Sequence, residues 1–247
     1  MQPLIVYGVS LSQPVRAVLW LLLMKRAPFE LRLINPGSKS EKGSRHPDYL
    51  AKSPGGTVPC IEEADGFTLS ESHAIMAYLC RSRGWSDLYP DDDRQRARID
   101  AYLHYHQRYI REASLGLVAP SFRKDLEIPQ VMQERAAGSV GIGLRTINDQ
   151  YLDGREFLLG DAPTIADISA YAEIGQLQPQ FTNVFDLTPY PEVCRWLENM
   201  QQLDFHDEVH VVLKEIGDIS TEAPSMETIV GANKLALKSL QAVLADF

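Results

Sequence analysis

Cysteine is scarce in this sequence, which has three cysteines among 247 residues. Cys60, Cys80 and Cys194 are odd in number and lie far apart in the chain. They therefore fit neither a disulfide framework nor the paired spacing of a zinc site, and we expect no bound metal. Free cysteines make a reducing compartment, the cytoplasm, the expected location.

The sequence also lacks a long apolar run and a basic leader. Its longest uncharged apolar stretch, residues 17–24, is far shorter than the roughly 20 residues that a membrane-spanning helix needs. The first residues, MQPLIVYGV, place no positive charge before an apolar segment, which argues against a secretory signal. We expect no membrane partner.

Positive charge is in short supply. The chain has 24 Lys and Arg residues against 33 Asp and Glu residues, which gives a formal net charge of −9. Nucleic-acid binding needs a basic surface against the phosphates, so this balance argues against a nucleic-acid partner. The excess negative charge lies after residue 82. The slightly basic first third either suits a small anionic ligand or is solvated surface charge.

Two halves of different pattern make up the chain. Residues 1–82 alternate strand and helix patterns, which predicts a compact α/β domain. Residues 83–93 resemble a linker, and residues 94–247 show almost no strand pattern, which predicts an all-helical domain with a C-terminal extension at 220–247. The expected elements are strands at 4–9 and 29–34, a hairpin at 58–62 and 67–69, and helices at 15–26, 70–83, 96–113, 192–202, 206–216 and 226–246, with one more helix after the capping box at Thr164.

Four motifs occur in an order and spacing typical of a known family. They are YGVSLSQPVRAV from residue 7, SPGGTVPCI from residue 53, FTLSESHAIMAYL from residue 67 and TIADI from residue 164. Together they resemble the cytosolic glutathione transferases, and LSQPVRAV is most similar to the theta class. The resemblance implies a thioredoxin-like N-terminal domain that binds glutathione, an all-α C-terminal domain that completes the site for a small hydrophobic electrophile, and a homodimer.

Ser10 and Ser12 precede a helix that begins around Pro14. A serine there is a common helix cap. The family motif implies instead that Ser12, with Ser10 as the fallback, donates a hydrogen bond that holds the glutathione sulfur as a thiolate. Ionising a thiol with a pKa of about 8.5 at pH 7 needs a shift of roughly 2 units, near 3 kcal/mol. A hydrogen bond to a charged group (~1.5–3 kcal/mol) and a helix N-terminus (~0.3–2 kcal/mol) together suffice without a general base.

The TVPC segment contains the second expected contact. Pro59 either opens a strand or, as the resemblance implies, follows a cis peptide bond. In the family this bond turns the backbone of the preceding residue, here Val58, toward the cysteine of glutathione. Thr57 stands where theta-like sequences commonly have lysine, so one charge contact is missing. Thr57 and Gln13 are further expected glutathione contacts.

Glu71 and Ser72 start the SESHAIMAYL helix. An acid and a serine are ordinary residues of a first helical turn. The resemblance implies that Ser72 and the helix N–H groups hold the γ-glutamyl carboxylate, while Glu71 receives the ammonium group. A helix N-terminus is a natural carboxylate site.

Five further residues complete the list of candidates. Either Arg45 or His46, in a loop that is one residue shorter than the family pattern, is expected to contact glutathione, unless this loop is simply solvated. Arg111 lies on a polar helix face, and the theta resemblance implies that its charge supports the thiolate. His206 and His210 have metal-compatible spacing but no third ligand, so we expect ordinary surface residues.

These observations predict a glutathione transferase whose thiolate attacks soft electrophiles, with glutathione as co-substrate and no cofactor. The alternatives are glutathione-dependent dehalogenation or peroxide reduction on the same fold, and a non-catalytic protein of this fold that binds ligands or partners. A cysteine-type redox transferase is excluded because no cysteine stands at the helix start.

The C-terminal extension leaves two possibilities open. Val230, Leu237, Leu240 and Leu244 recur at helical spacing and predict one buried face. Either this helix packs on the helical domain as structure, or it covers the electrophile pocket as a lid.

Overall fold

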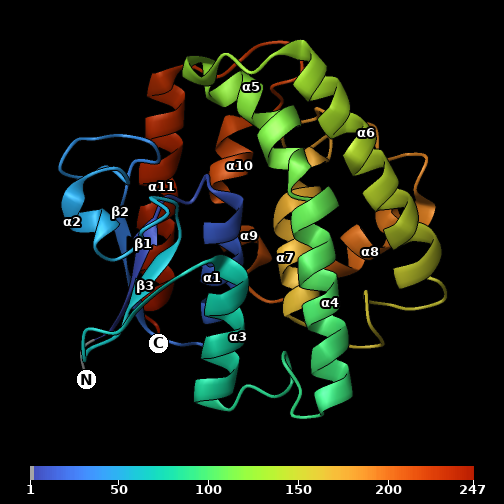
Figure 1. The fold of residues 1–247 in the computed structure, drawn as a ribbon, viewed down its shortest axis with the longest axis horizontal. Coiled ribbons are helices and arrows are strands. Elements are labelled where there is room, and N and C mark those ends of the chain that lie inside the picture. The colour runs from blue at the N-terminus through green and yellow to red at the C-terminus, as the bar shows by residue number, and fades with distance from the viewer. Residues whose placement is uncertain (1–2) are drawn as a thin grey trace.

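A four-stranded sheet lies at one side of the molecule (Figure 1). The computed structural model describes residues 3–247, apart from the side chain of Asp125. β1 runs parallel to β2, whereas β3 pairs antiparallel with both β1 and β4. This confirms the predicted order of strand, helix, strand and hairpin. The strands are β1 (Leu4–Gly8), β2 (Phe29–Leu33), β3 (Cys60–Glu62) and β4 (Thr68–Ser70), in the order β2-β1-β3-β4.

Two helices lie between the sheet and the rest of the molecule. They are α1 (Gln13–Met24) and α3 (Ser72–Arg83), and the short α2 (Pro47–Leu50) lies on the far side of the sheet in Figure 1. Every residue of α1 from 15 to 23 is buried, because α1 packs against α3, α7 and α9 as well as the strand layer. A helix that is apolar all round requires such enclosure.

The second half is helical, as predicted. Among the residues that the structure describes, no helix is long and apolar enough to cross a membrane. α7 lies in the centre and is buried along its whole length. The elements are α4 (Asp93–Tyr109), η1 (Ala113–Val118), α5 (Ala119–Phe122), η2 (Lys124–Leu126), α6 (Gln130–Thr146), η3 (Ile147–Tyr151), α7 (Ile165–Ile174), η4 (Gly175–Leu177), α8 (Pro191–Gln201), α9 (His206–Val209), α10 (Val211–Ile216) and α11 (Met226–Leu244).

The predicted capping box at the start of α7 is confirmed. The Thr164 hydroxyl accepts from the Ala166 N–H at 3.2 Å, and the Asp167 carboxylate accepts from the Thr164 N–H at 2.9 Å. Asp167 also accepts from the Leu158 N–H at 2.8 Å and from the Trp196 indole at 3.1 Å. Burial raises the pKa of Asp167, while these hydrogen bonds oppose the rise. One buried carboxylate therefore ties the start of α7 to the loop before it and to α8.

The expectation that His206 and His210 are surface residues is wrong. Their exposures are 6% and 1%. His206 Nε2 lies 2.6 Å from the Tyr171 hydroxyl, and the Trp20 ring packs edge-on against both imidazoles. Burial lowers the pKa of both side chains, so they are neutral members of an aromatic core that joins α1, α7 and α9.

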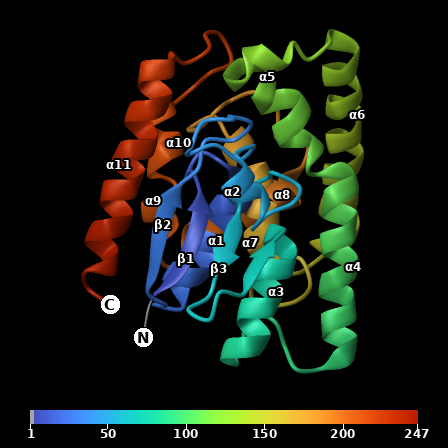
Figure 2. The same ribbon diagram turned by 60° about the vertical axis from the view of Figure 1, so that its left-hand side comes forward.

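The C-terminal helix α11 packs as part of the structure. Figure 2 shows it beside β2, and it contacts α10 and α9. Its buried side chains include Leu240, as predicted, but the others are the small Ala232 and Ala236. Val230, which we expected on the buried face, is 46% exposed, because the helix approaches α10 through its small residues. None of the residues that line the cavity described below belongs to α11, which favours the structural alternative over the lid.

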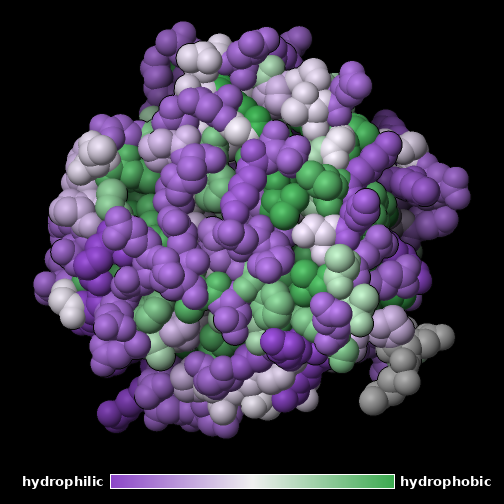
Figure 3. Space-filling model, turned by 180° about the vertical axis from the view of Figure 1, so that it is seen from behind, coloured by the Kyte–Doolittle hydropathy of each residue, from purple (hydrophilic) through white to green (hydrophobic). Residues whose placement is uncertain are grey.

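The surface seen from behind Figure 1 is mostly hydrophilic (Figure 3). Hydrophobic side chains gather there only in small patches that hydrophilic side chains separate.

Candidate functional site

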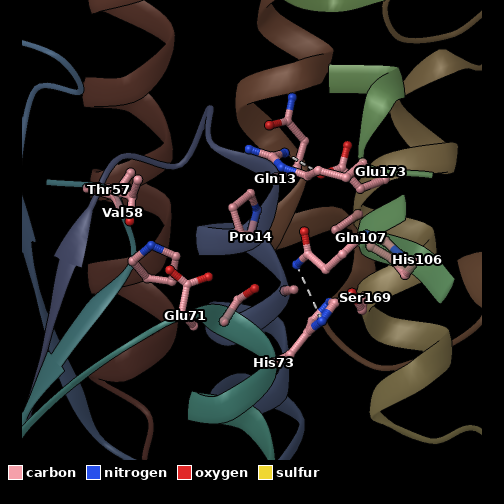
Figure 4. Close-up of a pocket in the computed structure, with 15 residues that line it drawn as sticks. Gln13, Pro14, Thr57, Val58, Glu71, His73, His106, Gln107, Ser169 and Glu173 are labelled. Carbon is pink, nitrogen blue, oxygen red and sulfur yellow. Dashed lines mark hydrogen bonds and ion pairs between the residues drawn. The ribbon is translucent and has the colours of Figure 1, made fainter. Parts of the chain in front are cut away.

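A cavity of about 140 Å³ lies where the two halves of the chain meet. In Figure 4, Thr57, Val58 and Glu71 lie on one side, and Gln107, His106 and Glu173 on the other, with Pro14 between them. The walls come from the start of α1, the loop before β3, the start of α3, α4 and α7. The lining residues are Gln13, Pro14, Ala17, Thr57, Val58, Pro59, Glu71, Ser72, His73, His106, Gln107, Arg111, Ser169, Ala172 and Glu173.

Ser12 lies at the N-cap position of α1, directly before the lining residues Gln13 and Pro14. Its backbone is extended, with φ −72° and ψ 123°, but its side chain makes no capping hydrogen bond. Ser12 is half-buried and is not itself part of the cavity wall. Ser10 is 1% exposed, and its hydroxyl has no hydrogen-bond partner among the described residues. Ser12 is thus the more accessible of the two serines.

A buried arginine holds the loop that carries these serines. Arg16 is 1% exposed, and its guanidinium donates to the carbonyls of Ser10 at 3.1 Å and Leu11 at 2.7 Å. Its other terminal nitrogen donates to the Ala172 carbonyl of α7 at 3.1 Å. Burial lowers the pKa of Arg16 to about 10, against the opposing charge of Glu173, so the side chain stays cationic at neutral pH. No sequence pattern predicted this contact, because Arg16 lies within an otherwise apolar helix.

The peptide bond between Val58 and Pro59 is cis, as the resemblance implied. The Thr57 carbonyl accepts from the Tyr49 hydroxyl at 2.7 Å and from the Ser53 hydroxyl at 3.1 Å, which fixes the approach to this bond. Among the hydrogen bonds of the described residues, none uses the N–H or C=O of Val58. Those two groups are free to pair with an extended peptide, in the manner of an added strand.

The start of α3 faces the same cavity. Glu71 has φ 72° and ψ 109°, a left-handed conformation for a residue with a side chain, and its carboxylate makes no capping hydrogen bond. Ser72, the first residue of α3, is 7% exposed. The first N–H groups of a helix lack partners inside the helix and favour a bound anion.

Arg111 is held by an acid of the neighbouring helix α7. It forms an ion pair with Glu173, whose side chain is 3% exposed and which also accepts from the Ser114 hydroxyl. Gln176 joins this network by donating to the Ser114 hydroxyl at 3.0 Å, and it accepts from Gln13 at 2.6 Å. The charge of Arg111 is thus partly neutralised, which reduces the support that it can give to an anion in the cavity.

Two histidines that the sequence did not single out as site residues line the cavity. His73 follows Ser72 and lies 2.6 Å from the Ser169 hydroxyl through Nε2, and 3.5 Å from the Gln107 amide nitrogen through Nδ1. Burial, with a smaller effect of Arg111, lowers the pKa of His73 to about 4. The His106 ring lies 5.1 Å from that of His73, and burial holds its pKa well below the usual value. Both imidazoles are therefore neutral at pH 7.

The remaining candidates lie away from the cavity wall. His46 caps α2, where its Nδ1 accepts from the Asp48 N–H at 3.3 Å, and Arg45 is exposed. Neither of them lines the cavity. No group of three or more His, Cys, Asp or Glu side chains within the described part of the chain could hold a metal ion.

Comparison with known proteins agrees with this arrangement. Two family models match the chain: "Glutathione S-transferase, N-terminal domain" over residues 6–86 and "Glutathione S-transferase, C-terminal domain" over residues 115–204. Human glutathione S-transferase theta-1 is 30% identical, over 88% of this chain and 91% of its own. Glutathione S-transferase T1 of Arabidopsis thaliana is 31% identical, over 93% of this chain and 96% of its own length.

Solved structures show the same likeness. A glutathione transferase of Bombyx mori superposes with a TM-score of 0.74 at 27% identity, covering 96% of this chain and 97% of its own. An epsilon-class glutathione S-transferase from the housefly, Musca domestica, gives a TM-score of 0.70 at 27% identity, covering 97% and 98%. The expected fold, a thioredoxin-like α/β domain followed by a helical domain, is confirmed, and the chain belongs to the glutathione transferase family.

Proposed function

We propose that this glutathione transferase is of the serine type and theta-like, and that Ser12 donates a hydrogen bond to the sulfur of bound glutathione. One observation carries the proposal. Ser12 stands directly before α1, its hydroxyl does not cap the helix, and the next two residues, Gln13 and Pro14, line the cavity. The LSQPVRAV motif and the likeness to human theta-1 support the theta assignment.

Glutathione is proposed to bind along the N-terminal wall. The unpaired backbone groups of Val58 support pairing with its cysteine, and Thr57 and Gln13 border the same space. The start of α3 at Ser72 suits the γ-glutamyl carboxylate, while the Glu71 carboxylate suits the ammonium group. Either Arg45 or His46 is proposed to contact glutathione as well. Neither of them lines the cavity, so this contact requires that glutathione extend beyond it.

The electrophile is proposed to enter from the helical side. Ala172 of α7, together with Pro14 and Ala17 of the neighbouring α1, gives the cavity apolar surface there, and Arg111, whose charge is partly neutralised by Glu173, also lines the cavity. The sulfur attacks carbon, a C–S bond forms, and either a halide leaves with its bonding electrons or an activated alkene takes up a proton. Positioning of the two reactants supplies much of the rate. Glutathione is a co-substrate here, and the proposal includes no resident cofactor.

The test is a panel of electrophiles assayed with glutathione: an aryl halide, an alkyl halide, an epoxide and an organic peroxide. The Ser12→Ala variant is expected to lower kcat by ten-fold or more, roughly 1.4 kcal/mol or above, with glutathione binding largely kept. Ser10→Ala is the matched control, because it removes a hydroxyl from the same loop. An inactive Ser10→Ala beside a fully active Ser12→Ala would identify Ser10 as the donor instead.

The same panel separates the alternatives. Turnover restricted to the alkyl halide or to the peroxide indicates a dehalogenase or a peroxidase, both of which use the same thiolate. Glutathione binding with no turnover of any member indicates a non-catalytic ligand-binding protein.

We further propose a cytoplasmic homodimer. Cys60, Cys80 and Cys194 are all unpaired, which suits a reducing compartment. The edge strand β4 follows Phe67, which is 43% exposed and packs against Tyr78, and this gives a second copy an apolar anchor. Sedimentation of the purified protein tests the dimer, and a monomer at micromolar concentration would contradict it.

A further inference from the structure

The C-terminal helix contacts the loop that carries Ser12. Asn233 of α11 accepts a hydrogen bond at its Oδ1 from the Leu11 N–H, at 3.1 Å. These residues are 222 positions apart in the chain. The contact reaches the site from outside, because α11 contributes no residue to the cavity wall.

The Asn233 amide is fixed in the orientation that this contact needs. Its Nδ2 donates to the Ile229 carbonyl at 2.9 Å, one turn earlier in α11. The oxygen of an amide accepts hydrogen bonds and its nitrogen donates them. A single orientation of the Asn233 amide places its oxygen at the Leu11 N–H and its nitrogen at the Ile229 carbonyl, so both contacts are made together. The Oδ1 atom is therefore aimed at Leu11 before any ligand binds.

Leu11 is held from three sides, and it is the residue immediately before Ser12. Asn233 binds its N–H, and the buried Arg16 binds its carbonyl at 2.7 Å. Its side chain packs against the cluster that contains Ala232 and Ala236 of α11. The Ser12 N–H in turn donates to the Val9 carbonyl at 3.0 Å. The backbone that aims the Ser12 hydroxyl is thus fixed jointly by α1 and α11.

We propose that Asn233 is a positioning residue for Ser12, so that the C-terminal helix tunes the ionisation of the glutathione sulfur through the loop rather than by covering the pocket. This inference rests on the proposed function of Ser12. A hydrogen bond that holds a thiolate depends on donor direction, and small displacements of a reacting group have large effects on rate.

The test uses the full-length Asn233→Ala variant. Alanine is the best helix former, so α11 keeps its helix while the contact to Leu11 is lost. We expect kcat to fall about 3- to 10-fold and the pKa of the bound thiol, followed by thiolate absorbance against pH, to rise by about 0.5–1 unit, since one unit corresponds to a factor of ten. The glutathione KM stays within two-fold. Lys234→Ala, at the exposed neighbouring position, is the matched control and behaves as the wild type.

Combining the substitution with Ser12→Ala separates positioning from a general loss of structure. If Asn233 acts through Ser12, Asn233→Ala has almost no further effect in the Ser12→Ala background. An equal loss in both backgrounds, or no loss in the wild-type background, overturns the inference while the role of Ser12 stands. A Ser12→Ala variant with full activity overturns the proposed function, and the inference with it.

Discussion

Glu71 lines the cavity and has an unfavourable backbone conformation. Its φ of 72° puts a side chain in the left-handed region, which costs roughly 1–2 kcal/mol. Such conformations persist where the surroundings fix them, and they cluster at sites that clamp ligands. The conformation brings the carboxylate and the start of α3 to the same wall of the cavity.

We expect Glu71→Ala and Ser72→Ala each to raise the glutathione KM several-fold while kcat changes much less. Their proposed contacts are made equally in the ground state and the transition state, and loss of such contacts weakens binding without slowing the chemical step. Steady-state kinetics at saturating electrophile measures both constants. Ser82→Ala, on the exposed last turn of α3, is the control. Unchanged glutathione affinity in both site variants would remove this wall from the site.

Single residues were predictable where a motif contained them. Val58, Glu71 and the other N-terminal candidates that line the cavity all lie between residues 13 and 72, within recognisable segments. His73, Ser169 and Glu173 were missed as site residues, because their contacts depend on how α4 and α7 pack against α3. A sequence pattern does not contain that relation between distant elements.

At the scale of elements, small residues determine how closely the helices of the second half pack. A methyl group added at Gly116 in η1 would lie 2.0 Å from the Cβ of Ala136 in α6. The same addition at Gly138, also in α6, meets nothing within 4 Å. These two glycines therefore make a matched pair for testing the packing.

We expect Gly116→Ala to lower the free energy of unfolding by about 1–3 kcal/mol, because η1 and α6 must move apart. Gly138→Ala is expected to raise it by about 0.5–1 kcal/mol, because alanine favours the helix and the methyl group has room. Urea unfolding of both variants measures the difference. Equal stabilities would show that the two elements separate without cost.

The helices and strands were easier to predict from the sequence than the neighbours against which each of them packs. Apolar periodicity predicted α4, and Ile99, Leu103 and His106 are indeed buried. The same reasoning failed for Val230, because periodicity identifies which residues share a face but not which neighbour covers it. For His206, the lack of a third metal ligand excluded a metal site but did not show whether the side chain is buried. α11 buries its alanine face, and the histidine lies under Trp20.

At the scale of the whole molecule, polar contacts join the two domains beside the cavity. Arg16 of the first domain binds the Ala172 carbonyl of the second, Gln13 binds Gln176, and His73 binds Ser169. Ligand site and domain contact therefore share residues, so a change in protonation at the boundary affects both. Among these residues, His73 is the one whose pKa, about 4 in the folded protein, lies within a pH range that stability measurements can reach.

The pH dependence of stability follows from the pKa of His73. Folding lowers this pKa from 6.5 to about 4, so between these values the unfolded chain binds a proton that the folded chain does not. The contribution of His73 to the free energy of unfolding is therefore fully present above about pH 6.5, and it decreases as the pH falls from about 6.5 to about 4. From pH 7 to pH 5 the contribution falls by about 2 kcal/mol, at about 1.36 kcal/mol per pKa unit.

We expect His73→Gln to remove that part of the acid sensitivity. Glutamine keeps a polar group near Ser169 but does not titrate, and the other buried histidines remain, so the difference between variant and wild type isolates His73. Urea unfolding at pH 7 and pH 5 should show a smaller drop for the variant by about 2 kcal/mol. His104→Gln, at an exposed position of α4, is the control and should keep the wild-type drop. An equal drop in His73→Gln would mean that His73 takes up its proton in the folded protein as readily as in the unfolded chain, and that the domain boundary opens to water.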